Sequence, residues 1–168
     1  MRPISRHALV LGIFPNVRGF AFVLFEGPFA LADWGVIRIR HAEKNRACVQ
    51  RVSQLFGQYQ PAVVVLQDMS ETGTRRSHRI RDLNAAIEVL AETQDIRTAF
   101  YSRAQVRQNA FEDGVVSRQA MAELIAKHIP MLERFVPPIR KRWMTEDPRM
   151  ALFEAAGLVL AFYRGQLK

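Results

Sequence analysis

Residues 7–40 read HALVLGIFPNVRGFAFVLFEGPFALADWGVIRIR. Two turn-forming interruptions, at Pro15-Asn16 and at Glu26-Gly27-Pro28, divide this stretch into three runs that are rich in β-forming residues. The runs cover 7–14, 18–25 and 31–40, and their short connections predict an antiparallel meander of three strands.

The rest of the chain alternates between helical and extended patterns. A short apolar run, AVVVL at 62–66, is typical of a central strand that is covered on both faces, and residues 96–101 predict another strand. Apolar residues also recur with the helical period in four stretches. These helices are expected over 48–59, over 80–90, after an N-cap at Ser117, and after Asp147-Pro148, where Thr145 is an alternative cap. We expect residues 102–116 to form a polar loop.

Length and composition indicate one soluble domain. The chain has 168 residues, of which 49% are hydrophobic and 24% charged, so we expect residues 1–168 to form a single α/β domain. The single cysteine, Cys48, excludes an internal disulfide. No apolar stretch is long enough to cross a bilayer, and the N-terminus lacks the cleavage site of a signal peptide. We therefore expect a cytoplasmic protein with no membrane partner.

The chain is strongly basic. Its 24 Lys and Arg residues exceed its 16 Asp and Glu residues, which gives a net charge of +8. Clustered cations displace condensed counterions from nucleic acid, so this charge favours a nucleic-acid partner. A basic protein without any such partner is the alternative interpretation.

Three short motifs suggest a family. Residues 12–16 read GIFPN and are followed by Arg18-Gly19-Phe20; the strand at 62–66 leads into Gln67-Asp68; and residues 154–161 read EAAGLVLA. In these motifs and in the order of its elements, the chain resembles the RuvC-type Holliday-junction resolvases of the RNase H-like superfamily. The resemblance implies a three-layer fold with a five-stranded mixed sheet of order 3-2-1-4-5 and helices on both faces. It also implies a possible homodimer, and DNA rather than RNA as the nucleic acid.

The resemblance further implies a nuclease with two divalent metal ions, and here the chain departs from the family. The family's first strand carries an aspartate between the two metals, whereas this chain has Phe14 there, which cannot coordinate a metal. We expect Asp68, Glu154 and Asp147 to be the catalytic carboxylates, with Asp68 and Glu154 holding Mg²⁺ or Mn²⁺ if the protein is active. Glu71 is a further acid near Asp68. Each of the three has a structural alternative: a strand end for Asp68, a helix cap for Asp147 and a solvated helix residue for Glu154.

Basic residues gather in the segments that follow the predicted strands. If they line one edge of the sheet, they suit a nucleic-acid groove, with Trp143 and Tyr101 available for base stacking. Solvated loop charges are the alternative. The expected nucleic-acid-binding residues are Arg75, Arg76, Arg79, Arg103, Arg107, Arg140, Lys141, Arg142 and Trp143.

Two functions follow from this pattern. The first is a divalent-metal-dependent endonuclease or resolvase with an atypical set of carboxylates. The second is a catalytically inactive relative that acts as a nucleic-acid-binding or protein-interaction subunit. Phe14 argues against the nuclease, because an aromatic ring removes the charge and fills the space of the metal.

Overall fold

The predicted meander forms half of a five-stranded sheet. The computed structural model describes residues 8–70 and 77–166. Its three N-terminal strands pair in antiparallel order, and the two later strands join the free side of the first in parallel, which gives the predicted order 3-2-1-4-5. The strands are β1 (Val10–Asn16), β2 (Gly19–Gly27), β3 (Ala30–Arg38), β4 (Val63–Gln67) and β5 (Arg97–Tyr101).

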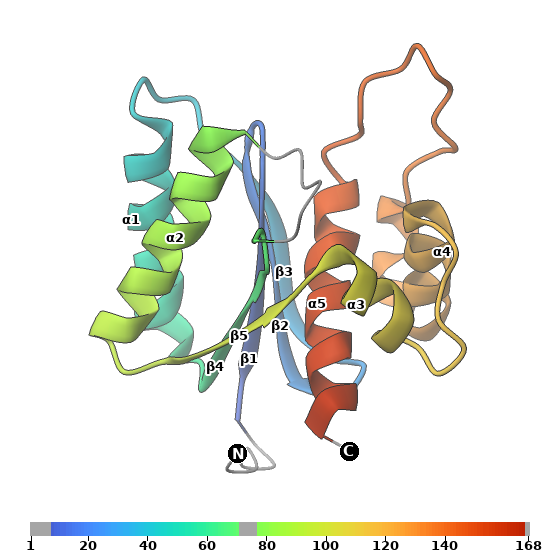
Figure 1. Ribbon diagram of the computed structural model, residues 1–168, viewed down its shortest axis with the longest axis horizontal. Helices are drawn as coiled ribbons and strands as arrows, with labels where there is room; N and C mark the ends of the chain where they lie inside the picture. The colour runs from blue at the N-terminus through green and yellow to red at the C-terminus, as the bar shows by residue number, and fades with distance from the viewer. Residues whose placement is uncertain (1–7, 71–76, 167–168) are drawn as a thin grey trace.

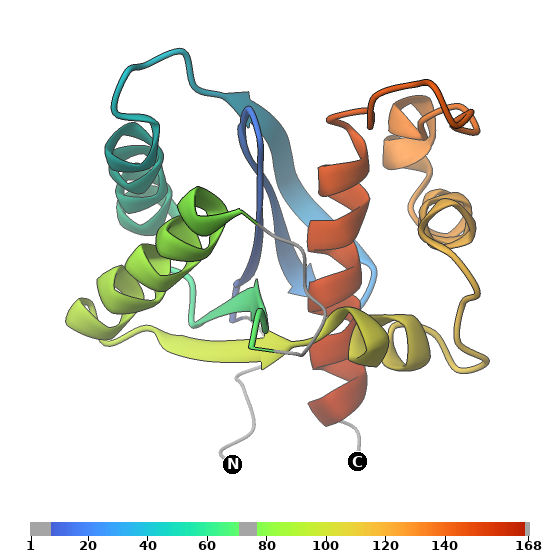
Figure 2. The ribbon, with the colours of Figure 1, turned by 45° about the horizontal axis from the view of Figure 1, so that its top comes forward.

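Helices cover both faces of the sheet, as predicted. On one face lie α1 (Lys44–Tyr59) and α2 (His78–Thr93), and on the other lies α5 (Met150–Gln166) (Figure 1). A further layer of short helices packs on the outer side of α5, so that α5 is enclosed between this layer and the sheet (Figure 2). The outer layer consists of α3 (Arg103–Asn109), α4 (Arg118–His128) and the 3₁₀ helix η1 (Pro130–Phe135).

Each strand divides its side chains between two apolar cores. In β1, Leu11 and Ile13 pack with the α1 and α2 side chains, whereas Val10 and Phe14 pack with α5. This alternation is the period of two that a β-strand imposes on its side chains. The position of a residue along a strand therefore decides which of the two cores its side chain joins.

Helix α5 approaches β1 closely because of a glycine. A Cβ atom at Gly12 would lie 2.6 Å from Val159 Cγ2 and 2.7 Å from the Ala155 carbonyl oxygen. No side chain fits in that space, so the absence of a Cβ sets the distance between strand and helix. On its outer side α5 meets α3 and α4 at Gly157, where a Cβ would lie 2.9 Å from Val106 and Met121.

One segment differs from its prediction. The expected polar loop at 102–116 contains α3, because Ser102 and Gln105 form a reciprocal capping box at its start. The helix is short, and its two arginines and two glutamines hide the apolar period. The N-cap predicted at Ser117 is confirmed by its hydroxyl, which accepts from the Ala120 amide at 3.1 Å.

Helix α5 is apolar around most of its circumference, yet it belongs to the interior of the fold. Within residues 8–70 and 77–166, no helix is both long enough and apolar enough to cross a bilayer. The buried residues of α5 run without interruption from Met150 to Phe162. A helix that is apolar all round requires cover on every side, which the sheet and the outer helices supply.

Candidate nucleic-acid groove and carboxylate cluster

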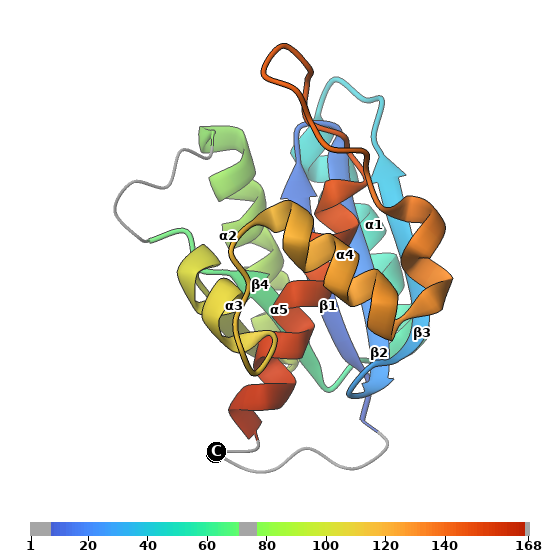
Figure 3. The same cartoon turned by 90° about the vertical axis from the view of Figure 1, so that its right-hand side faces the viewer.

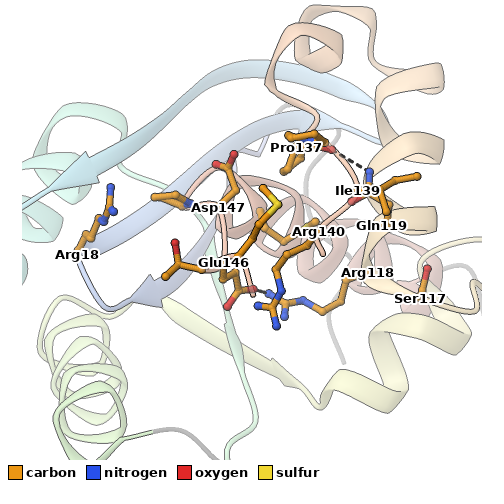
Figure 4. Close-up of a pocket in the computed structure, with 14 residues that line it drawn as sticks. Arg18, Ser117, Arg118, Gln119, Pro137, Ile139, Arg140, Glu146 and Asp147 are labelled. Atoms are coloured by element: carbon orange, nitrogen blue, oxygen red, sulfur yellow. Dashed lines mark hydrogen bonds and ion pairs between the residues drawn. The ribbon is translucent and has the colours of Figure 1, made fainter. Parts of the chain in front are cut away.

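A groove opens where β1 ends and α5 begins. It consists of two adjoining pockets of about 560 and 390 Å³, and we call it the arginine groove (Figure 4). Phe14 and Asn16 of β1 lie at one end, and Ile139 and Arg140 from the segment before α5 lie at the other. Both pockets are lined by Arg18, Arg118, Thr145, Glu146, Asp147 and Pro148. The carboxyl end of a central strand is a usual place for ligand binding in α/β sheets.

Glu154 is the only charged residue in the buried stretch of α5, and it pairs with Arg118. The Arg118 Nε atom donates to Glu154 Oε1 at 2.5 Å, and the Glu154 side chain is only 7% exposed. The same guanidinium also pairs with Glu146. Arg118 is the first residue of α4, where the Ser117 cap places it beside α5. One arginine thus joins α4, α5 and the segment before α5 at the wall of the groove.

Asp147 lies one turn before α5 and belongs to a different ion pair. The Arg149 guanidinium donates to both of its carboxylate oxygens, at 3.0 Å to Oδ1 and 2.6 Å to Oδ2. These hydrogen bonds lower the pKa of Asp147 below its ordinary value, and the nearby charge of Arg18 acts in the same direction. The Asp147 Oδ1 atom also accepts from the Arg149 amide, so the carboxylate orders the turn that leads into the helix.

The position of the expected first-strand aspartate is filled by a buried ring. Phe14 is 2% exposed and packs among α5 side chains. In the parallel ladder Gly12 pairs with Val65, the last pair between β1 and β4, and because Val65 packs on the α5 face, the alternation of β4 places Gln67, two residues on, on that face as well. Gln67 is buried, and among the described residues its Oε1 atom has no hydrogen-bond partner. An aromatic ring and a neutral amide therefore stand where strands β1 and β4 end on this face.

Asp68 lies apart from Phe14. It follows Gln67 directly, and both line a separate pocket with Arg81, Asn84 and Phe100, on the side of α2. Its Oδ1 atom accepts from the amide and the hydroxyl of Ser70, at 2.9 and 2.6 Å. These two hydrogen bonds lower the pKa of Asp68 and hold its carboxylate in the turn after β4.

Comparison with known proteins agrees with this architecture. Neither a scan against protein-family models nor a search of curated proteins finds a match. Among solved structures, RuvC of Thermus thermophilus matches with a TM-score of 0.67 and 18% identity over 95% of this chain and 96% of its own. The fold is that of the RuvC-type resolvases.

Two further structures extend the comparison. T. thermophilus RuvC in complex with a Holliday junction substrate has a TM-score of 0.69 and 16% identity, over 95% of this chain and 94% of its own. The yeast mitochondrial Holliday junction resolvase has a TM-score of 0.63 and 14% identity, over 98% of this chain and 81% of its own.

The carboxylates that the structure describes in this RuvC-like fold do not fit a two-metal centre. Two divalent ions require several carboxylate oxygens that converge on one space. Here Glu154 is held by Arg118, Asp147 by Arg149, and Asp68 by Ser70 in another pocket. Within the described part of the chain, no three His, Cys, Asp or Glu residues lie close enough to bind one metal ion. The predicted Glu71 lies outside the described residues.

The predicted basic residues that the structure describes fall into three groups. The Arg79 guanidinium donates to the Asn16 carbonyl of β1 and to Asn45 Oδ1 of α1, both at 3.0 Å, so Arg79 ties the start of α2 to these two elements. Arg103 and Arg107 belong to α3 and do not line the arginine groove. The group at 140–143 is exposed beside it. Arg75 and Arg76 lie outside the described residues.

Sequence analysis missed three residues that shape the groove. Arg18 lies in the β1–β2 turn, where Asn16 Oδ1 accepts from the Arg18 and Gly19 amides. Arg118 and Glu146 come from segments that meet only in the folded chain, so no local spacing relates them to Glu154. A usable signal was the position of Arg118 directly after the Ser117 cap, which fixes its place at a helix start.

Proposed function

We propose that this protein binds nucleic acid, with DNA as its main partner, along the arginine groove, and that it does so without cleavage by a two-metal centre. The observation that carries the proposal is that some arginines near the groove are paired with carboxylates and others are not. Arg118 and Arg149 are paired with carboxylates, whereas Arg18, Arg140 and Arg142 make no ion pair with any described residue. Exposed cations beside a groove offer contacts to phosphates, and arginine suits such contacts because of its planar fork of donors.

The fold supports DNA as the partner. One of the similar structures is a RuvC bound to a Holliday junction substrate. In this chain the groove lies at the carboxyl end of β1, and the net charge of +8 favours association with a polyanion. Arg118 is shared between Glu154 and Glu146, and Asp147 pairs with Arg149, so the groove cations that remain for a phosphate backbone are Arg18 and Arg140.

The proposal predicts a salt-dependent affinity that is located at the groove. Fluorescence anisotropy with a labelled DNA measures the affinity at several salt concentrations. The variant R140A/R142A removes the groove cation Arg140 and the exposed Arg142 beside it, and it should reduce the slope of log K against log salt by about 1.8, because about 0.9 counterions are released per duplex phosphate contact. The variant R46A/R51A removes the same charge from exposed positions on α1 and is the matched control.

Three outcomes would contradict the proposal. Affinity that does not depend on salt would exclude phosphate contacts. Equal losses in R140A/R142A and R46A/R51A would indicate attraction by net charge alone. Cleavage of the labelled DNA that requires Mg²⁺ or Mn²⁺ and is lost in D68N would restore the metal-dependent nuclease. We expect instead that EDTA leaves binding unchanged and that neither metal promotes cleavage.

A further inference from the structure

The segment between η1 and α5 ends in a fully exposed loop. Every residue from 138 to 146 is exposed, and we call this stretch the Trp143 loop. Its tip is a turn in which the Met144 amide donates to the Lys141 carbonyl at 3.0 Å. Figure 3 shows the loop projecting beyond the first turn of α5. Its base is fixed, because Glu146 pairs with Arg118.

The loop exposes an unusual amount of apolar surface. Trp143 is 79% exposed and Ile139 is 75% exposed, with Met144 beside them. Among the described residues, the exposed aliphatic side chains Val89 and Val116 carry no such run of cations beside them, and Phe29, which is 40% exposed, stacks on His128. A tryptophan left in water forgoes a large burial energy, so an exposed one in a fixed loop indicates a surface that binds.

The charges around Trp143 indicate the chemistry of the partner. Three cations, Arg140, Lys141 and Arg142, precede the ring directly, and the Lys141 ammonium lies 5.3 Å from its centroid. That cation covers one face of the indole and leaves the other to solvent. A partner that combines negative charge with flat π-faces satisfies both features, and nucleic acid bases on their phosphate backbone have this combination.

We propose that Trp143 stacks on an unpaired base, so that the protein prefers nucleic acid with unpaired bases to a continuous duplex. This inference rests on the proposed function, since the arginine groove must first bind the backbone. In a continuous duplex each base face is already stacked on its neighbour, and the indole finds no free face. Ile139 and Arg140 line the groove, so a strand that leaves it reaches the loop directly.

The test uses the tryptophan itself as the reporter. The chain has two tryptophans. Trp34, in β3, is half-buried against Phe135 of η1. In the W34F variant, the fluorescence of Trp143 is observed alone during titration with oligothymidylate and with a blunt duplex of equal length. Stacking quenches indole emission, so we expect quenching by the single strand and little quenching by the duplex at equal saturation.

Affinity measurements provide the second readout. Base stacking on an aromatic side chain is worth about tenfold or more in affinity. W143A should therefore weaken the binding of oligothymidylate by about that factor, W143F should retain most of it, and the duplex affinity should change little. V116A removes an equally exposed apolar side chain outside the loop and should have no effect.

The outcomes separate the two proposals. If the wild type binds neither DNA, the proposed function fails. If both DNAs bind with a salt dependence but W143A binds the single strand as the wild type does, or Trp143 emission stays unchanged at saturation, the stacking inference alone is wrong. A blue shift with anionic lipid vesicles and none with oligothymidylate would also overturn it, because the loop would then bind membrane surfaces.

Discussion

The two faces of the sheet are covered in different ways. Helices α1 and α2 form a single layer whose outer sides are exposed, and their contact with the sheet is mainly apolar, with a few polar links such as those from Asn84 to the Gln67 carbonyl and from Tyr59 to Asp33. Helix α5 is enclosed on both sides, by the sheet and by α3, α4 and η1, and still carries a carboxylate in its buried stretch. A charged group in so dense a layer must be paired within the protein. The α5 face can therefore carry the polar wall of a site, whereas the α1 and α2 face serves as support.

The largest expected effect comes from breaking the pair inside the α5 layer. R118A leaves Glu154 buried without its cation, and the loss of one partner of a buried pair costs about 3 kcal/mol of unfolding free energy. Urea denaturation at neutral pH measures the change. The double variant R118M/E154L removes both charges and should recover most of the lost stability.

The matched change on the other face is R46A. Arg46 pairs with Glu43 at the start of α1, with both side chains exposed, so its removal should cost less than about 1 kcal/mol. Equal costs for R118A and R46A would mean that water reaches Glu154. In that case the comparison of the two faces would be wrong.

The second prediction tests the packing between β1 and α5. In G12A, the new methyl group would meet Val159 and the Ala155 carbonyl, so strand and helix must separate. Overpacking of this kind costs about 1–3 kcal/mol, which thermal or urea denaturation detects. Gly57, in α1 on the other face, has no atom within 4 Å of the position that a Cβ would take, and G57A should stabilise the protein by up to about 1 kcal/mol.

A stabilising or neutral G12A would contradict this account. It would show that α5 moves easily relative to β1. The arginine groove, which lies between the end of β1 and the start of α5, would then lack a rigid frame.

The sheet and its order could be predicted because each strand carries a local signal. The meander has turn residues at Pro15-Asn16 and at Glu26-Gly27-Pro28. The short and apolar AVVVL run at 62–66 is typical of a strand that is covered on both faces. Helix α3 was missed because its signal lies in a capping box, Ser102 with Gln105, and not in apolar periodicity. Elements marked by turn residues or by an apolar run were therefore predicted, and the helix whose signal is a capping box was not.

The site was harder to predict because it depends on pairing between distant segments. Asp68 and Gln67 are adjacent in sequence, and only the parallel register of β1 and β4 shows that Gln67, and not Asp68, lies on the face of Phe14. Likewise, Glu154 is an ordinary helix residue in the sequence, and its partner Arg118 is 36 positions away. The expectation that Phe14 leaves no place for a metal needed no structure, since the ring has no donor atom.

The smallest expected effect concerns the ion pair at the entry to α5. Hydrogen bonds from Arg149 hold the pKa of Asp147 below its usual range in the folded protein. A lowered folded-state pKa adds stability above the ordinary aspartate pKa, near 3.9, and this contribution is lost as the pH falls through the folded value. D147N should therefore be less stable than the wild type at pH 7, by about 1 kcal/mol or less because the pair is partly exposed, and the difference should shrink below about pH 4.

Urea denaturation across this pH range checks this difference in stability. The control is E43Q on the α1 side, whose exposed pair should give little difference at any pH. A difference between D147N and the wild type that persists in acid would mean that the charge of Asp147 is not its cause.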